Sequence, residues 1–177
     1  VPYQKLSVSE IVAKSSNIGT AKIAIHMGTN KLIPYLKKLH IPYPENLNDK
    51  LILSQFAIGY SPMALSPEQL LGVWCKLAVD DKDIFISRAT VSAISRMLSV
   101  EVKYQNSASS AGIVDGWGVI QTGTYRVASS SDYIGSCIGF IPREQPKYVL
   151  LVSIKREGKS LYGKAVVPIW KNIMAHL

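Results

Sequence analysis

The spacing of apolar positions changes along the chain, and it predicts helices first and strands later. In several segments up to about residue 102, apolar residues recur every three or four positions, as one face of a helix requires. After Gly112 the period becomes that of strands, and a last helical pattern closes the chain. We therefore expect an α+β fold, with helices followed by a three-stranded meander and a C-terminal helix.

Local signals set the limits of these elements. Ser7 and Glu10 have the spacing of a capping box, and residues 66–68 combine an N-cap serine, a proline and an acid. Thr29 or Asn30 is expected to cap a helix whose first turn tolerates Pro34. Because the turns between strands are short, the strands must pair antiparallel. The predicted helices span 7–13, 18–28, 31–39, 66–79, 87–102 and 163–177, and the predicted strands span 117–127, 133–141 and 147–155; residues 51–60 are apolar, with no element assigned.

Side-chain patterns predict which residues are buried. Cys75 lies on an apolar helix pattern and Cys137 in a strand pattern, so we expect both to be small core residues. Two cysteines are too few for a disulfide framework. The other expected core positions are Leu70, Leu71, Trp74, Leu77 and Ala78 in one helix and Val166, Ile169, Trp170 and Ile173 in the last.

Composition narrows the classes of function. The chain has 177 residues, 47% of them hydrophobic, which suits one domain or a large part of a bigger one. Its net charge is +8, but lysines and arginines are scattered without a basic stripe, so no nucleic-acid partner is expected. His26, His40 and His176 stand far apart, and no metal or cofactor is expected. No apolar run approaches the roughly 20 residues of a membrane span. The first residue is Val1, from which we expect an upstream part.

Two short motifs carry the candidate chemistry. Ser15-Ser16-Asn17 reads S-x-N, and Gln121-Thr122-Gly123-Thr124 is close to K-T-G, two signatures of serine acyl-transfer enzymes. The third signature, S-x-x-K, carries the nucleophile and is absent, because no serine has a lysine three residues later. Alternatively, Ser15 and Asn17 simply cap a helix, while Thr122 and Thr124 are ordinary strand residues and Gly123 a bulge.

Further segments in a fixed order extend these motifs. They are residues 15–19, 31–36, 59–70, 122–124, 139–142, 148–152 and 162–165. With them the chain resembles the C-terminal part of the transpeptidase domain of class B penicillin-binding proteins, the enzymes that cross-link peptidoglycan during bacterial division or elongation. The resemblance implies a single partial domain of the penicillin-binding-protein and β-lactamase-like fold. Residues 1–112 would form a mainly helical lobe with the S-x-N motif, and residues 113–177 the strands with Q-T-G-T and the last helix.

The resemblance also implies roles for individual residues. Ser15 would be a relay hydroxyl beside the missing Ser and Lys, and Asn17 would hold the amide of the donor peptide. Residues 121–124 would bind substrate, with Thr122 and Thr124 on the terminal carboxylate. The backbone N–H of Thr124 would be one oxyanion donor, a kind of group whose loss can cost about 10²–10³-fold in rate.

Two departures from the family pattern leave two hypotheses open. S-x-x-K is missing, and Gln121 replaces the lysine of K-T-G, so a charge is lost. The chain is either part of a transpeptidase that is inactive by itself, or a degenerate, non-catalytic homologue that binds cell-wall peptide or a division partner.

The family also implies a location and partners. These are the periplasmic face of the bacterial inner membrane, an N-terminal anchor helix, stem peptides or β-lactams, and proteins of the division or elongation machinery. Without upstream strands, one edge and one face of the meander would lie open, and we expect the upstream part or an oligomer partner to cover them.

Overall fold

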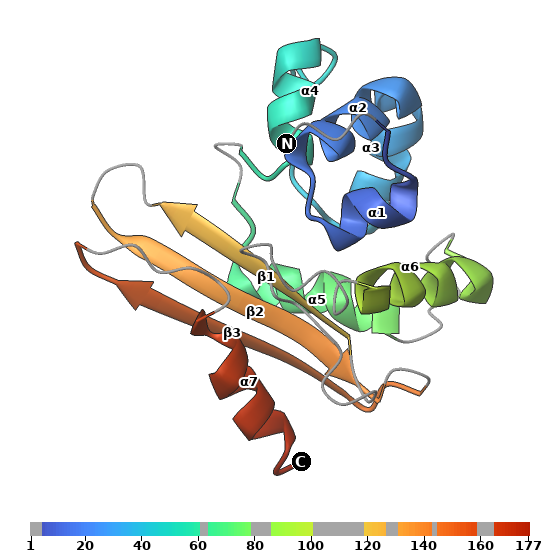
Figure 1. Cartoon of the computed structure of the whole chain (residues 1–177). Helices are drawn as coiled ribbons and strands as arrows, with labels where there is room; N and C mark the ends of the chain where they lie inside the picture. The colour runs from blue at the N-terminus through green and yellow to red at the C-terminus, as the bar shows by residue number, and fades with distance from the viewer. Residues whose placement is uncertain are drawn as a thin grey trace.

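The computed structural model divides into a helical lobe and a sheet flanked by helices (Figure 1). It describes residues 5–60, 64–78, 86–100, 119–126, 131–142, 145–158 and 165–177, without the side chains of Ala13, Arg88, Ser99, Val100 and residues 119–121. The helices are α1 (Val8–Ala13), α2 (Asn17–Met27), α3 (Thr29–Lys38), α4 (Lys50–Ala57), α5 (Pro67–Ala78), α6 (Arg88–Val100) and α7 (Val167–Met174), and the strands are β1 (Val119–Arg126), β2 (Tyr133–Ile141) and β3 (Tyr148–Arg156).

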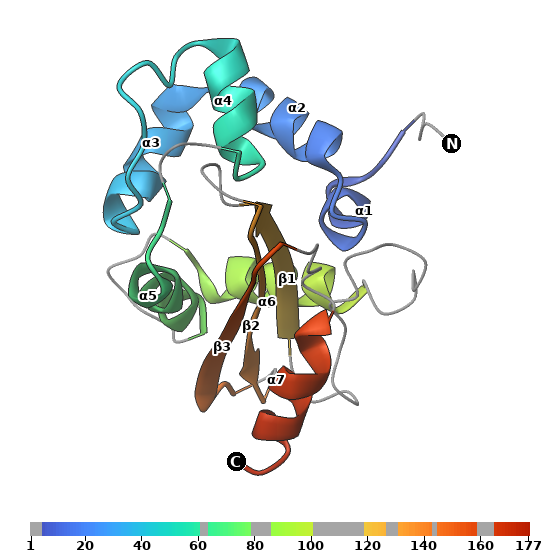
Figure 2. The same ribbon diagram turned by 90° about the vertical axis from the view of Figure 1, so that its left-hand side faces the viewer.

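The three strands form an antiparallel sheet in the order β1-β2-β3, which confirms the predicted meander. Helices lie on both faces of this sheet (Figure 2). On one face, Trp74 of α5 packs against Ile138 and Phe140 of β2. The tilted rings of Trp74 and Phe140 have centroids 6.0 Å apart. The expected α+β architecture is therefore present.

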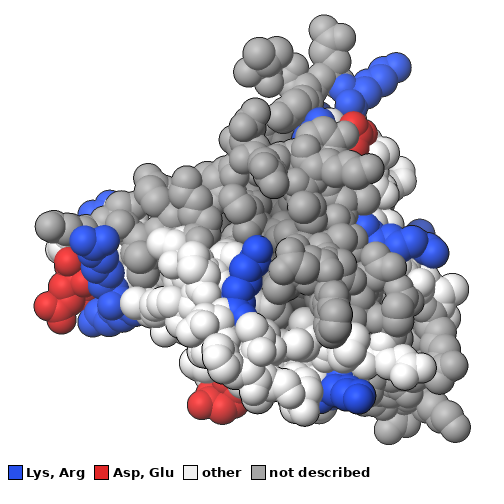
Figure 3. Space-filling view, turned by 60° about the horizontal axis from the view of Figure 1, so that its bottom comes forward, with Lys and Arg blue, Asp and Glu red and all other residues white. Residues whose placement is uncertain are grey.

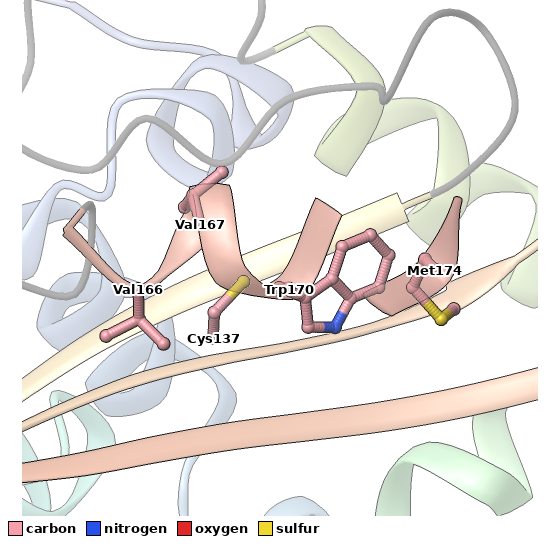
Figure 4. Close-up of a cluster of buried hydrophobic side chains, with 5 residues drawn as sticks. All are labelled: Cys137, Val166, Val167, Trp170 and Met174. Carbon is pink, nitrogen blue, oxygen red and sulfur yellow. The ribbon is translucent and has the colours of Figure 1, made fainter. Parts of the chain in front are cut away.

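Helix α7 covers the other face of the sheet (Figure 4). Trp170 is fully buried there, and its indole N–H donates a hydrogen bond of 2.8 Å to the carbonyl of Leu150. Cys137, as predicted, is buried beneath this helix. The predicted helix face was only half right, because Ile169 and Ile173 are exposed. The buried residues of this segment are Val166, Val167, Trp170 and Met174.

The helical lobe has a core of its own between α2, α3 and α4. Ala24, Leu36, Leu47 and Leu53 are buried together in it. Helix α4 was not assigned from the sequence; it begins after Asp49, whose carboxylate accepts hydrogen bonds from two backbone N–H groups.

Two local predictions for the lobe and for α5 are wrong. Helix α3 follows Gly28 directly, so Thr29 and Asn30 lie inside it and Pro34 lies beyond the first turn. Thr29 instead hydrogen-bonds to Asn48 across the loop. Cys75 is exposed on α5, and neither cysteine forms a disulfide. The predicted ends at residues 102 and 117 lie outside the described residues.

Candidate active site

The S-x-N motif lies at a sharp junction between α1 and α2. Ser15 has a φ of 49°, in the left-handed region that a serine rarely adopts. Ser16 is the N-cap of α2, and its hydroxyl accepts a hydrogen bond of 3.2 Å from the N–H of Gly19. Asn17 is the first residue of α2. The capping alternative for Ser15 and Asn17 is therefore wrong, because Ser16 caps the helix.

The capping role of Ser16 leaves Ser15 and Asn17 at the surface. Both residues are exposed, and no hydrogen bond of either side chain to a described residue is present. A non-glycine residue in a strained conformation is expected where function requires it. The junction therefore presents a hydroxyl and an amide to solvent on a fixed backbone.

Helix α1 is held in place from both of its ends. At its start, Ser7 and Glu10 form the predicted capping box, with bonds of 2.8 and 3.3 Å. Hydrogen bonds from the backbone N–H and hydroxyl of Ser7 hold the pKa of Glu10 below its usual value. At its far end, the backbone N–H of Ser16 donates to the carbonyl of Ile11 at 2.9 Å. These bonds fix the backbone that leads into Ser15.

Close packing between α1 and α2 depends on Gly19. This residue is buried, and a Cβ atom added to it would lie 2.6–2.9 Å from three side-chain carbons of Ile11. Real Cβ contacts are not that short. The motif therefore needs a glycine two residues after Asn17 for the two helices to approach, a requirement that the sequence alone did not reveal.

The Q-T-G-T motif lies on β1, which is an edge strand among the three strands that the structure describes. Thr122 pairs with Cys137, Gly123 with Ser136 and Thr124 with Gly135. The register runs without interruption from Val119 to Arg126, so the prediction of a bulge at Gly123 is wrong. An edge strand presents backbone N–H and C=O groups that its single neighbour does not use. The motif therefore offers both hydroxyls and main-chain groups to a ligand that lies along β1.

Packing among the described residues does not explain the glycine at position 123. Gly123 is exposed, and a Cβ added to it would meet no atom within 4 Å. Its φ is not in the left-handed region. A glycine in a strand also allows close approach of another molecule, which is consistent with the predicted substrate-binding role. Gln121 pairs with Ile138, but its side chain lies outside the described part of the chain.

One helix connects the two motifs. Helix α6 packs against both α1 and β1. In Figure 1, β1 is the strand of the sheet that faces the lobe of α1 to α4. The helix that leads into the S-x-N junction and the strand that carries Q-T-G-T thus share a common neighbour, on the side of the sheet where the lobe lies.

The hollow on the helical lobe does not include residues of the two motifs. This hollow lies on α2 and α3 and is lined by Met27, Lys31, Pro34, Tyr35 and Lys38. Within the described ranges, His, Cys, Asp and Glu form no group of three that could hold a metal ion. On the face in Figure 3, the Lys and Arg side chains are dispersed, with acidic ones beside some of them.

The comparisons with known proteins agree with the motifs. The family model for the penicillin binding protein transpeptidase domain matches residues 1–175. The chain therefore belongs to the penicillin-binding-protein transpeptidase domain family, as its segments suggested.

Curated relatives and solved structures give the same result. Peptidoglycan D,D-transpeptidase FtsI of Buchnera aphidicola subsp. Schizaphis graminum is 28% identical over 97% of this chain and 37% of its own length. The probable peptidoglycan D,D-transpeptidase PenA of Neisseria flavescens is 26% identical over 98% of this chain and 52% of its own length. The chain thus spans about a third to a half of these relatives.

Solved structures share the fold at low identity. The transpeptidase domain of FtsI4 D,D-transpeptidase from Legionella pneumophila has a TM-score of 0.79 at 24% identity, over 96% of this chain and 68% of that one. PBPA from Mycobacterium tuberculosis has a TM-score of 0.75 at 16% identity, over 99% and 49%. These likenesses show that the helices, meander and last helix belong to a penicillin-binding transpeptidase fold.

Proposed function

We propose that this chain is the C-terminal part of the transpeptidase domain of a peptidoglycan D,D-transpeptidase. The full-length protein would cross-link stem peptides ending in D-alanyl-D-alanine through a serine ester. The family match over residues 1–175 carries the proposal. The exposed S-x-N junction, which follows α1, and the Thr-Gly-Thr motif on β1 support it, because α1 and β1 pack on the same helix, α6.

The proposed roles are those that the family resemblance implies for the matching motif positions. Ser15 relays a proton to or from the nucleophile and lysine supplied upstream, and Asn17 holds the amide of the donor peptide. Thr122 and Thr124 bind its terminal carboxylate, and the backbone N–H of Thr124 donates to the oxyanion. An edge strand suits these tasks because an extended peptide can lie beside it. Without S-x-x-K, the 177 residues alone should not turn over substrate.

The surfaces that remain open support a partner within the same polypeptide. Among the described strands, β3 pairs only with β2, so its other edge has no partner in this part of the chain. Ile169, Ile173 and Leu177 form an exposed apolar row, with exposed fractions of 44%, 41% and 62%. We propose that upstream residues of the full-length protein cover this edge and this row.

The proposed location is the extracytoplasmic face of the bacterial inner membrane. The relatives are named FtsI and PenA, which suggests a role in division, and partners from the division machinery would follow. The family resemblance implies an N-terminal anchor helix, and we include it in this proposal. None of the described helices is long and apolar enough to cross a bilayer.

A non-catalytic homologue is the second candidate function. Gln121 favours it, because an amide cannot supply the positive charge of the lysine in K-T-G. In this case the same two motifs would bind stem peptides or a division protein without acyl transfer.

Covalent labelling of the full-length protein with a fluorescent penicillin separates the two candidates. A transpeptidase takes up one β-lactam per polypeptide, as an intact-mass shift, and Ser15→Ala or Asn17→Ala slows the uptake. Ser92→Ala is the matched control, because Ser92 is an exposed serine of α6 that belongs to neither motif. If the full-length protein stays unlabelled, the enzyme proposal is wrong and the non-catalytic candidate remains.

A further inference from the structure

The hollow on the helical lobe is a surface that neither motif uses. It has a volume of about 400 Å³ and is lined by Met27 at the end of α2 and by Lys31, Pro34, Tyr35 and Lys38 of α3. Ligand pockets in proteins begin at roughly 300 Å³. The hollow is therefore large enough to take a large apolar side chain from another molecule.

Helix α3 has two faces of different character. Leu32, Ile33 and Leu36 pack into the core of the lobe. The residues of α3 that line the hollow have the spacing i, i+3, i+4 and i+7, which places them together on another face. On that face Tyr35 has an exposed fraction of 42%, and Pro34 is exposed beside it. The outer face of α3 thus presents apolar groups between two lysines.

The hollow lies in a part of the chain whose charges are all basic. Residues 11–44 contain no aspartate or glutamate, although the whole chain has 12 acidic residues. The same range contains the lysines at positions 14, 22, 31, 37 and 38. The scatter of basic residues along the whole chain hides this local imbalance. A partner for this surface should therefore carry negative charge.

Two lysines place positive charge at the two ends of the hollow. Lys31 is exposed and makes no ion pair with any residue that the structure describes. At the other end, Nζ of Lys76 in α5 donates a hydrogen bond of 3.2 Å to the carbonyl of Lys38. The apolar floor of the hollow is therefore flanked by cations from two different helices.

The dimensions favour a peptide over other acidic partners. From Lys31 to Lys38 is seven residues of helix, or about 10 Å. An acyl chain needs roughly 15 Å, half the hydrocarbon core of a bilayer. Nucleic acid binds largely through its phosphates and does not require an apolar floor. An extended peptide advances about 3.3 Å per residue, so two acids three residues apart can lie over both ends.

We propose that the hollow is a docking site for an acidic peptide segment of a partner protein. An apolar side chain of this segment lies against Tyr35 and Met27, residue types that are enriched at protein interfaces. Its flanking carboxylates bind Lys31 and the cations at the other end. The site is separate from the S-x-N junction, because Met27 follows Asn17 by ten residues of α2, about 15 Å along the helix. This inference goes beyond the proposed transpeptidase function and does not depend on it.

The test is the binding of a fluorescent hexapeptide to the full-length protein, measured by fluorescence anisotropy. The peptide has a leucine and a phenylalanine between two pairs of glutamates, and both of its ends are blocked. Tyr35→Ser should weaken binding about 10-fold or more, as the loss of an aromatic anchor does. Lys31→Glu should weaken it roughly 3- to 10-fold, because an attraction between exposed charges becomes a repulsion. Raising the salt from about 0.1 M to about 1 M should also weaken binding, since the charges are screened.

Matched controls are exposed residues of the same types outside the lobe. Tyr148 of β3 has the same exposed fraction as Tyr35, 42%, and Lys147 is exposed beside it. Tyr148→Ser and Lys147→Glu should leave the affinity for the peptide unchanged. Lys31→Glu also places an acid in the first turn of α3, where the helix dipole favours it, so unfolding of α3 would not explain a loss of binding. Melting temperatures of all four variants report any general loss of folding.

Other results overturn the proposal. It is wrong if wild type does not bind the peptide, or if all four variants lose affinity alike. It is also wrong if serines in place of the leucine and phenylalanine of the peptide leave the affinity unchanged, because the hollow would then play no part. If the peptide does not bind but Lys31→Glu abolishes sedimentation with phosphatidylglycerol vesicles, the surface binds lipid instead. If Tyr35→Ser converts a dimer to a monomer, the occupant is a second copy of the chain.

Acylation by benzylpenicillin separates this inference from the proposed function. The rate should be the same with and without saturating peptide, because the hollow and the motifs are different surfaces. If the peptide blocks acylation and Tyr35→Ser does not relieve the block, the peptide binds at the motifs and the inference fails. If wild type binds the peptide in the hollow but is not acylated, the transpeptidase proposal fails and the docking site stands.

Discussion

The packing of α1 against α2 gives the sharpest prediction, because one methyl group should disturb it. In Gly19→Ala the new Cβ would lie 2.6, 2.8 and 2.9 Å from Cγ1, Cγ2 and Cδ1 of Ile11. Two of these carbons are attached to Cβ of a β-branched side chain, which has one strongly preferred rotamer in a helix. The contact therefore cannot be relieved by moving only the tip of Ile11.

The size of the effect follows from two opposing terms. Overpacking of this kind costs about 1–3 kcal/mol. Replacing glycine by alanine within a helix returns at most about 1 kcal/mol. Gly72→Ala in α5 isolates the second term, because a Cβ at Gly72 meets no atom within 4 Å. Gly19→Ala should thus be roughly 1–3 kcal/mol less stable than Gly72→Ala.

Thermal unfolding of the full-length protein measures this difference. With about 2–4 °C per kcal/mol for a domain of 150–250 residues, the two variants should differ by about 2–12 °C. Ile11→Ala removes all three clashing carbons, so its combination with Gly19→Ala should recover the loss in a double-mutant cycle. Ile11→Val keeps Cγ1 and Cγ2 and should recover little.

The same variants connect packing to the junction that holds Ser15. Penicillin labelling should slow in Gly19→Ala and recover when Ile11→Ala is added. Equal stability of Gly19→Ala and Gly72→Ala would refute the reasoning. So would full recovery by Ile11→Val.

Three further predictions concern other parts of the fold. Trp170→Ala should lower the free energy of unfolding by about 3–5 kcal/mol, measured from the drop in melting temperature, because it leaves a cavity in the core under α7. A loss of stability below about 1 kcal/mol would contradict that packing. A thiol reagent should modify exposed Cys75 in the native protein and spare buried Cys137. Burial raises the pKa of the Cys137 thiol from its ordinary value of 9.0 to about 12, so this thiol stays protonated at pH values between the two. If mass spectrometry shows that both thiols react equally, Cys137 is accessible. If upstream residues cover them, Ile169→Ser with Ile173→Ser should lower the free energy of unfolding of the full-length protein by more than the roughly 0.5 kcal/mol typical of surface changes. No change would mean that this row is solvated.

Much of the fold could be predicted because the signals are local. The capping box at Ser7 and Glu10 and the serine start of α5 depend on residues a few positions apart, and both helices begin where expected. Strand β2 has the predicted limits, because the sequence on both sides of it is rich in residues typical of turns.

The errors arise where tertiary contacts decide between local alternatives. Apolar residues flank Trp170 on both sides along α7, and only the position of the sheet selects Val167 and Met174 over Ile169 and Ile173. Cys75 has apolar neighbours in sequence but faces away from Trp74 and the sheet. The hydrophobic periodicity of the sequence alone could not show which residues of these two helices are buried.

The candidate site divides in the same way. The motifs at residues 15–17 and 121–124 could be found from residue types and order alone. The left-handed conformation of Ser15 and the cap formed by Ser16 are properties of the junction, which depends on the contact between Ile11 and Gly19. That β1 runs without a bulge and has β2 as its single partner among the described strands depends on tertiary pairing, which residue order alone does not show.

The central claim is that the helix junction and the edge strand contact one and the same ligand. A crystal structure of the full-length protein acylated by benzylpenicillin measures this directly. We predict that Ser15 or Asn17 and at least one of Thr122 and Thr124 lie at hydrogen-bond distance, about 2.7–3.2 Å, from the bound molecule. A penicillin held by only one of the two motifs, with the other facing empty solvent, would contradict the account.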